Sequence, residues 1–132
     1  MTRYIYLAID TSARLFSMKL QTMSSSARRK EFARLRDQLA NIGWISEGYV
    51  QDRASSEAGG TAYPWTRKVK GKTVCVALSK EQYEWLKQAI ANWRTVQDTL
   101  RQMQRLSREE LFECLPNPKR RKELSKEVLG LV

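Results

Sequence analysis

The 132-residue chain contains no histidine and only two cysteines. The absence of histidine excludes the commonest general base, the usual nitrogen ligand of metals and every histidine-based catalytic triad. Cys75 and Cys114 lie far apart in the sequence, so no pair of ligands has the spacing of a zinc site. Two thiols without a disulfide framework fit the reducing cytoplasm, where we expect the protein to act without a cofactor.

Long apolar runs are also missing. The run "YIYLAI" at residues 4–9 is ended by Asp10 and is too short for a secretion signal or a transmembrane helix. Because Met23 follows, we interpret residues 1–22 as an N-terminal extension, which either precedes the natural start of the domain or adds an edge strand. No association with a membrane is expected.

Sequence patterns of catalysis are scarce. Paired carboxylates occur as Glu81 with Glu84 and as Glu109 with Glu113, where neighbouring cations and helix dipoles explain them. The stretch "AGGTAY" at residues 58–63 lacks the lysine and the following helix of a phosphate-binding loop. The chain is therefore not expected to be an enzyme.

Acidic residues are outnumbered by basic ones. The chain has 14 Asp and Glu against 24 Lys and Arg, which gives a formal net charge of +10. Such an excess favours polyanionic partners, and nucleic acid is the favoured one here, with DNA ahead of RNA. The alternative is that the charge only keeps the protein soluble. The hydrophobic fraction of 42% predicts a globular rather than a disordered chain.

A first amphipathic helix is expected within residues 24–43. Its apolar residues recur at spacings of three and four and form one face: Phe32, Leu35, Leu39 and Ile42. Ser25 or Ser26 is expected to cap its start, and Gly43 is expected to end it in a left-handed conformation.

A second, longer helix is expected over residues 79–106. Ser79 and Gln82 form a capping box at its start. Its apolar stripe contains Tyr83, Leu86, Ile90, Trp93 and Leu100. A second capping box, Ser107 with Glu110, predicts that this helix breaks and that a short helix follows.

Three strands are expected near residues 45–52, 61–69 and 72–78. Lys70-Gly71 predicts a two-residue turn between the last two, with Gly71 at positive φ. The resulting register places most apolar side chains of this hairpin on one face. The expected fold class is therefore α+β, a small three-stranded antiparallel sheet with a β-hairpin, packed against two amphipathic helices, one of them long.

We expect one α+β domain over residues 23–115 and a basic C-terminal tail over residues 116–132. The tail contains four consecutive cations: Lys119, Arg120, Arg121 and Lys122. They are interpreted as flexible contacts to phosphate, although a nuclear localisation signal has the same composition.

The hairpin contains the densest group of cations outside the tail, in the stretch "TRKVKGKTV". Its members are Arg67, Lys68, Lys70 and Lys72. Lysine on an exposed strand also prevents edge-to-edge aggregation, which explains Lys68 without any ligand. Arg67 falls on the apolar face by register, near the tip of a ribbon that could reach a phosphate or a base edge. Binding and solubility both remain open as its role.

The long helix has a basic residue at every seventh position. These residues are Lys80, Lys87, Arg94, Arg101 and Arg108. A helix drifts about 20° per heptad, so the first four stay on one flank, whereas Arg108 is expected beyond the break. Such a row could follow a nucleic-acid backbone. Two alternatives are solvated cations bordering the core and the flanking positions of a helical dimer.

The four tryptophans are expected mostly in the core, with one exception. Trp85 lies off the apolar stripe and is interpreted as a contact to a partner. Trp93 lies on that stripe and Trp65 on the buried face of the sheet.

Three stretches carry a resemblance: "EGYV", "AYPWTRKVKGKTVCVALSKEQ" and "AIANWR". The segment from Gly43 to about Leu106 resembles a family of small basic prokaryotic proteins of unknown function, often encoded near mobile elements. Many members carry a cysteine cluster and a His-Gly-Pro-Tyr run before the hairpin, which this chain lacks, so their zinc knuckle is not transferred. The resemblance implies a non-enzymatic role associated with nucleic acid and linked to a mobile element.

Two functions follow as hypotheses. The first is a nucleic-acid-binding accessory protein that uses the hairpin cations, supported by the helix row and the tail. The alternative is a protein–protein adaptor or a dimerisation subunit. In this hypothesis the long helix docks on a protein partner or on a second copy of the chain, and the charge serves solubility.

Overall fold

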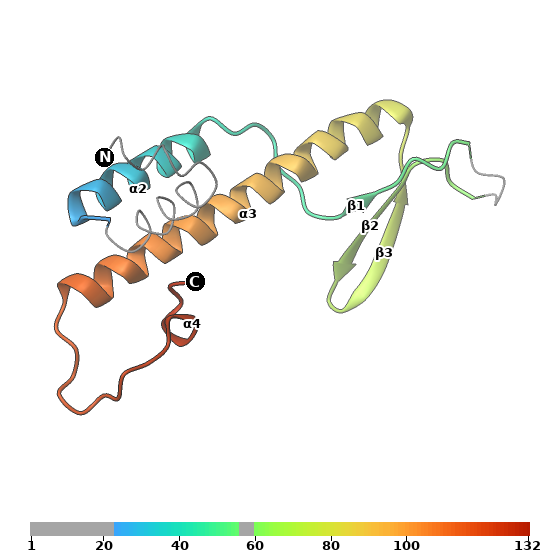
Figure 1. The fold of residues 1–132 in the computed structure, drawn as a ribbon. Coiled ribbons are helices and arrows are strands. Elements are labelled where there is room, and N and C mark those ends of the chain that lie inside the picture. Colours follow the sequence, from blue (N-terminus) through green and yellow to red (C-terminus); the bar gives the residue numbers. More distant parts are fainter. Residues whose placement is uncertain (1–22, 56–59) are drawn as a thin grey trace, which may run out of the picture. The chain divides into compact units, whose positions relative to one another are not determined.

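The computed structural model describes residues 23–55 and 60–132, whose element order is α2, β1, β2, β3, α3 and α4 (Figure 1). The expected N-terminal extension, residues 1–22, lies outside these residues. Described residues up to Arg36 and from Met103 onward form one compact unit, and Asp37–Gln102 form the other. The predicted α+β class is confirmed by a three-stranded antiparallel sheet and a long helix.

The hairpin forms as the sequence predicts. β2 spans Pro64–Val69 and β3 spans Lys72–Ala77. The predicted register is confirmed, because Trp65 pairs with Val76, Arg67 with Val74 and Val69 with Lys72. Lys70 has φ 50° and Gly71 has φ 80°, so both turn residues are left-handed. This is the type I′ turn, whose twist matches that of the two strands.

The first strand is shorter than expected. β1 spans Tyr49–Val50 and pairs with β2, which makes β2 the central strand. The predicted span of 45–52 is wrong at its start, because the amide of Ser46 donates to the carbonyl of Ala89 on α3 at 3.2 Å. The backbone amide of Ser46 is therefore hydrogen-bonded to the helix and not to a neighbouring strand.

The sheet packs on the first half of α3, which spans Lys80–Cys114. The capping box at its start is confirmed, since the Ser79 amide donates to Gln82 Oε1 at 3.0 Å and the Gln82 amide to Ser79 Oγ at 3.1 Å. The core consists of Leu86, Ala89 and Ile90, against which Val50, Trp65 and Leu78 pack. Burial of Leu86 and Ile90 contributes about 1.5–3 kcal/mol for each side chain, so this cluster holds the sheet in place.

The predicted break in the long helix is wrong. α3 continues through Ser107, whose hydroxyl donates to the carbonyl of Met103 at 2.9 Å. Glu110 does not complete a capping box, because its carboxylate accepts hydrogen bonds from Ser25 and Arg28 instead. Arg108 therefore lies inside α3 and not beyond its end.

Helix α2 spans Ser25–Ala40, and its cap differs from the prediction. Ser24 is the capping residue, since its hydroxyl accepts a hydrogen bond from the Ala27 amide at 3.1 Å. Ser25 and Ser26 were expected in this role. The side chain of Ser25 donates to a carboxylate on α3, which removes it from the backbone.

The end of α2 also differs. Two bonds of the i to i+3 type tighten the last turn: Asn41 N to Gln38 O and Ile42 N to Leu39 O, both at 3.3 Å. Gly43 follows but is not in the left-handed region, so its predicted role as a C-cap is wrong. The tightened turn satisfies carbonyls that a left-handed cap would otherwise satisfy.

The C-terminal tail returns to α3. α4 spans Lys126–Leu129, is capped by Ser125, and ends at Gly130 with φ 73°. A Cβ at Gly130 would lie 2.7 Å from Cδ of Arg108, so glycine allows the chain to approach this side chain closely. Val128 on α4 is 69% exposed.

Candidate nucleic-acid interface

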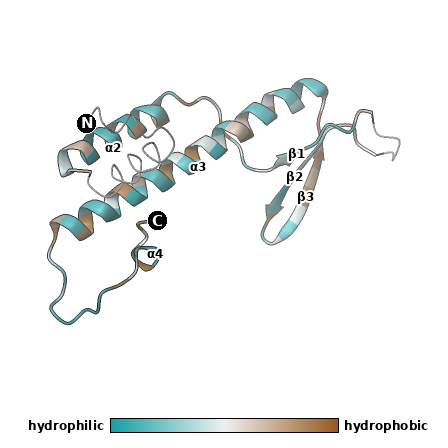
Figure 2. Ribbon diagram, viewed as in Figure 1, coloured by the Kyte–Doolittle hydropathy of each residue, from teal (hydrophilic) through white to brown (hydrophobic). Residues whose placement is uncertain are grey.

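Three lysines of the hairpin tip are free of acidic partners. Lys68, Lys70 and Lys72 are exposed, and none forms an ion pair with any residue of the described chain. Figure 2 shows the hydrophilic character of this end of the hairpin, in contrast to the apolar part of β3. The tip is therefore a compact group of positive charges that is not neutralised within the described part of the chain.

Arg67 is held differently from the lysines. Its guanidinium carbon lies 5.0 Å from the centroid of the Trp65 ring, in a cation–π contact. Its Nε is buried and has no hydrogen-bond partner among the described residues, and no described carboxylate pairs with it. The stacking restrains the Arg67 side chain, and its positive charge is not neutralised by a described carboxylate. Such a guanidinium can bind an anion.

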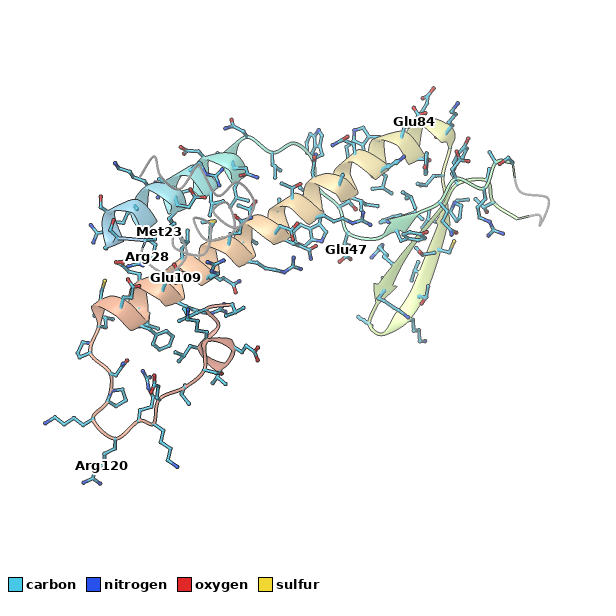
Figure 3. The ribbon with its side chains drawn as sticks, in the orientation of Figure 1. Met23, Arg28, Glu47, Glu84, Glu109 and Arg120 are labelled. Carbon is cyan, nitrogen blue, oxygen red and sulfur yellow. The ribbon has the colours of Figure 1, made fainter. Side chains whose placement is uncertain are left out.

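A pocket of about 400 Å³ lies beside these cations on the sheet. Its lining residues are Glu47, Gly48, Tyr49, Thr66, Arg67, Lys68 and Thr73. Tyr49 is 54% exposed, and Glu47 lies on the segment that leads into β1 (Figure 3). Sequence reasoning missed this pocket, although the alternation of Tyr49 and Val50 places the tyrosine on the outer face of a half-buried strand.

The helix row is exposed but partly engaged. Lys80, Lys87, Arg94 and Arg101 are all exposed. Lys87 lies 5.8 Å from the ring centroid of Tyr83, and Arg101 pairs with the exposed Asp98. Exposed ion pairs contribute at most about 1 kcal/mol, so such a pair exchanges readily for a phosphate contact. Arg94 forms no ion pair with a described residue.

Arg108, the fifth member of the heptad series, is engaged. It donates to Gln104 Oε1 at 3.1 Å and to the carbonyl of Gly130 at 3.5 Å. It stabilises the end of the tail on α3, so we do not count it among the free cations of the row.

The basic tail is exposed. All four of its consecutive cations lie at the surface: Lys119, Arg120, Arg121 and Lys122. Arg120 extends away from the chain, whereas the Arg121 guanidinium lies 5.4 Å from the ring centroid of Phe112 (Figure 3). The tail belongs to one compact unit and the hairpin to the other, so they are separate candidate contacts.

Two tryptophan rings form an exposed aromatic pair. Trp44 is 76% exposed and Trp85 is 55% exposed, with ring centroids 6.3 Å apart. The expectation that Trp44 lies in the core is wrong, because its ring is exposed to solvent. Its backbone is held to α3, since the Asn92 side chain donates to the Trp44 carbonyl at 2.9 Å. The surface position predicted for Trp85 is confirmed.

An apolar pocket of about 390 Å³ adjoins the Trp85 ring. It is lined by Trp65, Leu78, Glu81, Gln82, Trp85 and Leu86. Exposed aromatic surface beside an apolar pocket is typical of a site where a protein partner docks.

A further charged cluster joins α2 and the end of α3. Arg28 is 3% exposed and pairs with Glu110 at 3.1 Å and Glu113 at 2.7 Å. Burial opposes the charge of Arg28, but hydrogen bonds to Glu113 and then Glu110 raise its pKa above the ordinary value. A hydrogen bond from Ser25, followed by one from Arg28, lowers the pKa of Glu110. Positive and negative groups satisfy one another here, so this cluster is structural.

Within residues 23–55 and 60–132, no group of three or more cysteine and acidic side chains is arranged to hold a metal ion. No helix in the same residues combines the length and the apolar character needed to cross a bilayer.

No protein-family model, curated protein or solved structure matches this chain. The resemblance of residues 43–106 to a family associated with mobile elements therefore stays a prediction.

Proposed function

We propose that this protein binds nucleic acid through its β-hairpin as a non-enzymatic accessory protein, with DNA ahead of RNA as the partner. One observation carries the proposal. The hairpin presents Lys68, Lys70 and Lys72 without acidic partners, beside an arginine stacked on Trp65 that also lacks one.

The other arginines of the chain sharpen this contrast. Several of them meet a carboxylate: Arg28 with Glu110, Arg34 with Glu31, Arg101 with Asp98, and Arg105 with Glu109. The pairs of Arg28 and Arg105 are largely buried and serve the fold, whereas those of Arg34 and Arg101 lie at the surface. The hairpin cations have no such partner among the described residues, which is also true of the other described lysines. Their density distinguishes them, because Arg67, Lys68, Lys70 and Lys72 lie close together around one turn, and this supports an external polyanion.

The helix row and the tail support the hairpin in this proposal. Lys87, Arg94 and Arg101 provide further phosphate contacts along one flank of α3, and the cations at 119–122 contact the backbone from the tail. The proposed setting is the cytoplasm, which two thiols without a disulfide framework fit, and the resemblance implies an association with a mobile element.

A matched pair of triple variants tests the proposal. The first changes Lys68, Lys70 and Lys72 to glutamine and keeps Arg67, whose stacking contributes to packing. The second changes three exposed cations of α2 to glutamine: Arg29, Lys30 and Arg36. Each triple removes three positive charges, so the comparison separates the site from net charge.

Fluorescence anisotropy with a labelled oligonucleotide at fixed salt provides the measurement. The hairpin triple is expected to weaken binding at least tenfold, while the α2 triple weakens it only slightly. Equal weakening by both triples would show that net charge alone attracts the nucleic acid. Absence of binding by the wild-type protein at low salt would reject the proposal.

A second candidate function is docking of a protein partner on the aromatic pair. It is favoured by the exposure of Trp44 and Trp85 beside the apolar pocket. Light scattering at several concentrations, with and without DNA, separates the two functions. A dimer that Trp85→Gln dissociates would support self-association, and a monomer that binds DNA would favour the first function.

A further inference from the structure

We infer that the pocket on the outer face of the sheet binds an unpaired nucleotide, with its base stacked on Tyr49. The inference deepens the proposed function and rests on it, because it assigns single-stranded nucleic acid as the substrate class. It is carried by the position of Tyr49 and by the mixed chemistry of the pocket that contains it.

The Tyr49 ring is available for stacking. Tyr49 pairs with Thr66 across β1 and β2, and Thr66 pairs with Cys75 across β2 and β3, so these three lie on the face opposite Trp65. Tyr49 is 54% exposed and forms no ring contact with another aromatic side chain of the described chain. An exposed ring on a flat sheet face can receive a base, because every base presents a π-face.

The pocket combines positive and negative side chains, which is not the lining expected of a site for phosphate alone. Lys68 provides positive charge on this face, whereas the Arg67 guanidinium stacks on Trp65 on the other face. Glu47 lines the same pocket and repels a bare phosphate. A carboxylate accepts hydrogen bonds from the amino and imino groups of a base. The lining therefore matches a whole nucleotide, with base donors near Glu47 and the flanking phosphates near the cations.

Double-stranded nucleic acid does not fit this chemistry. In a duplex the faces of the bases are covered by their neighbours and their Watson–Crick edges are paired, so neither Tyr49 nor Glu47 can reach them. An unpaired strand exposes both. The volume of about 400 Å³ lies within the range of about 300–1,000 Å³ found for small-molecule sites, so a base can enter.

Two variants of Tyr49 test the inference in the full-length protein. Tyr49→Phe keeps the aromatic face, whereas Tyr49→Leu keeps apolar bulk and removes it. We expect Tyr49→Phe to bind a labelled single-stranded oligodeoxynucleotide within about twofold of wild type, and Tyr49→Leu to bind it about tenfold more weakly. Binding of the corresponding duplex is expected to change little in either variant.

An abasic oligonucleotide provides a test that does not depend on the folding of a variant. It keeps the phosphates and removes the bases, so wild-type binding is expected to fall about tenfold, while Tyr49→Leu loses little further. Equal wild-type affinity for the abasic and the normal strand overturns the inference.

The outcomes distinguish the inference from the proposed function. If Tyr49→Leu binds single strands as wild type does while the hairpin triple is defective, the protein binds nucleic acid without stacking at Tyr49. In that case the inference fails and the proposed function stands. If wild type binds neither single strands nor duplex, both fail.

Discussion

Gly48 lets β1 reach the central strand at a point where a side chain would collide. Its φ is 114°, and a Cβ built there would lie 2.2 Å from Nε1 of Trp65. The same indole nitrogen donates to the carbonyl of Glu47 at 3.2 Å. Since Trp65 packs on the core of the sheet and holds the Arg67 guanidinium, this glycine positions both the core and the candidate site.

Substitution of Gly48 by alanine is expected to lower the free energy of unfolding by more than about 2 kcal/mol, because backbone strain adds to the displacement of Trp65. Gly71→Ala is the control. Its φ is 80°, but nothing lies within 4 Å of the added Cβ, so a loss of about 1 kcal/mol is expected. Urea unfolding measures both, and equal losses would contradict a role for the close approach.

Glu110 gives the fold a dependence on acidic pH. Its pKa is lowered, first by the hydrogen bond from Ser25 and then by Arg28. An unfolded glutamate titrates near pH 4.3, so the stabilisation by Glu110 is present above that value and is lost as the pH falls through its lower folded pKa. Stability should therefore decline as the pH is lowered from about 5 to about 3.

Glu110→Gln is expected to reduce this decline, because an amide does not titrate. Urea midpoints measured at several acidic pH values compare the variant with wild type. Glu123→Gln serves as the control, since Glu123 is exposed and pairs with no residue of the described chain. An identical pH profile for wild type and Glu110→Gln would argue against the coupling to Ser25 and Arg28.

At the scale of the element, one sequence pattern gives two outcomes within α3. Ser79 with Gln82 and Ser107 with Glu110 are both capping boxes in sequence, yet only the first begins a helix. The difference is tertiary. The Glu110 carboxylate binds Arg28 and Ser25 of α2, so it does not bond the Ser107 amide as a capping box requires, and the helix continues through Ser107.

Alanine is expected to lower the free energy of unfolding at Ser79 but not at Ser107. Ser79→Ala removes a cap and should cost about 1 kcal/mol of unfolding free energy. Ser107→Ala removes a mid-helix hydroxyl bonded to the Met103 carbonyl, so it should be neutral or stabilising by a few tenths of a kcal/mol. Chemical unfolding of both variants checks this, and a cost of about 1 kcal/mol at Ser107 would contradict the continuous helix.

In the sheet, the local sequence pattern predicts the hairpin but not the start of β1. The alternation of residues 63–78 and the Lys70-Gly71 turn determine the hairpin register, because a slip by one residue would reverse every side chain. β1 was predicted less well, since its start depends on a hydrogen bond from Ser46 to Ala89 that no local pattern encodes. Likewise, the core cluster followed from periodicity, whereas the outward position of Trp44 depends on Asn92.

At the scale of the whole molecule, the charge was predictable and its distribution among pairs was not. The sequence shows where Arg67 and Arg101 lie, but only the structure shows that one stacks on Trp65 and the other pairs with Asp98. The pocket beside Tyr49 was not predicted, since it needs Glu47 and Tyr49 to meet Lys68 across two strands. Long-range pairing of strands brings such residues together.

The salt dependence of binding reports how many of these charges meet phosphate. Each contact contributes about 0.7 to the slope of log affinity against log salt for single strands and about 0.9 for duplex DNA. Loss of Lys68, Lys70 and Lys72 should therefore reduce the slope by about 2 to 3. The α2 triple of Arg29, Lys30 and Arg36 should leave it nearly unchanged, because the slope depends on counterions released at contacts and not on net charge alone. Anisotropy titrations across a range of salt concentrations measure the slope, and equal reductions in the two triples would place the phosphate contacts outside the hairpin.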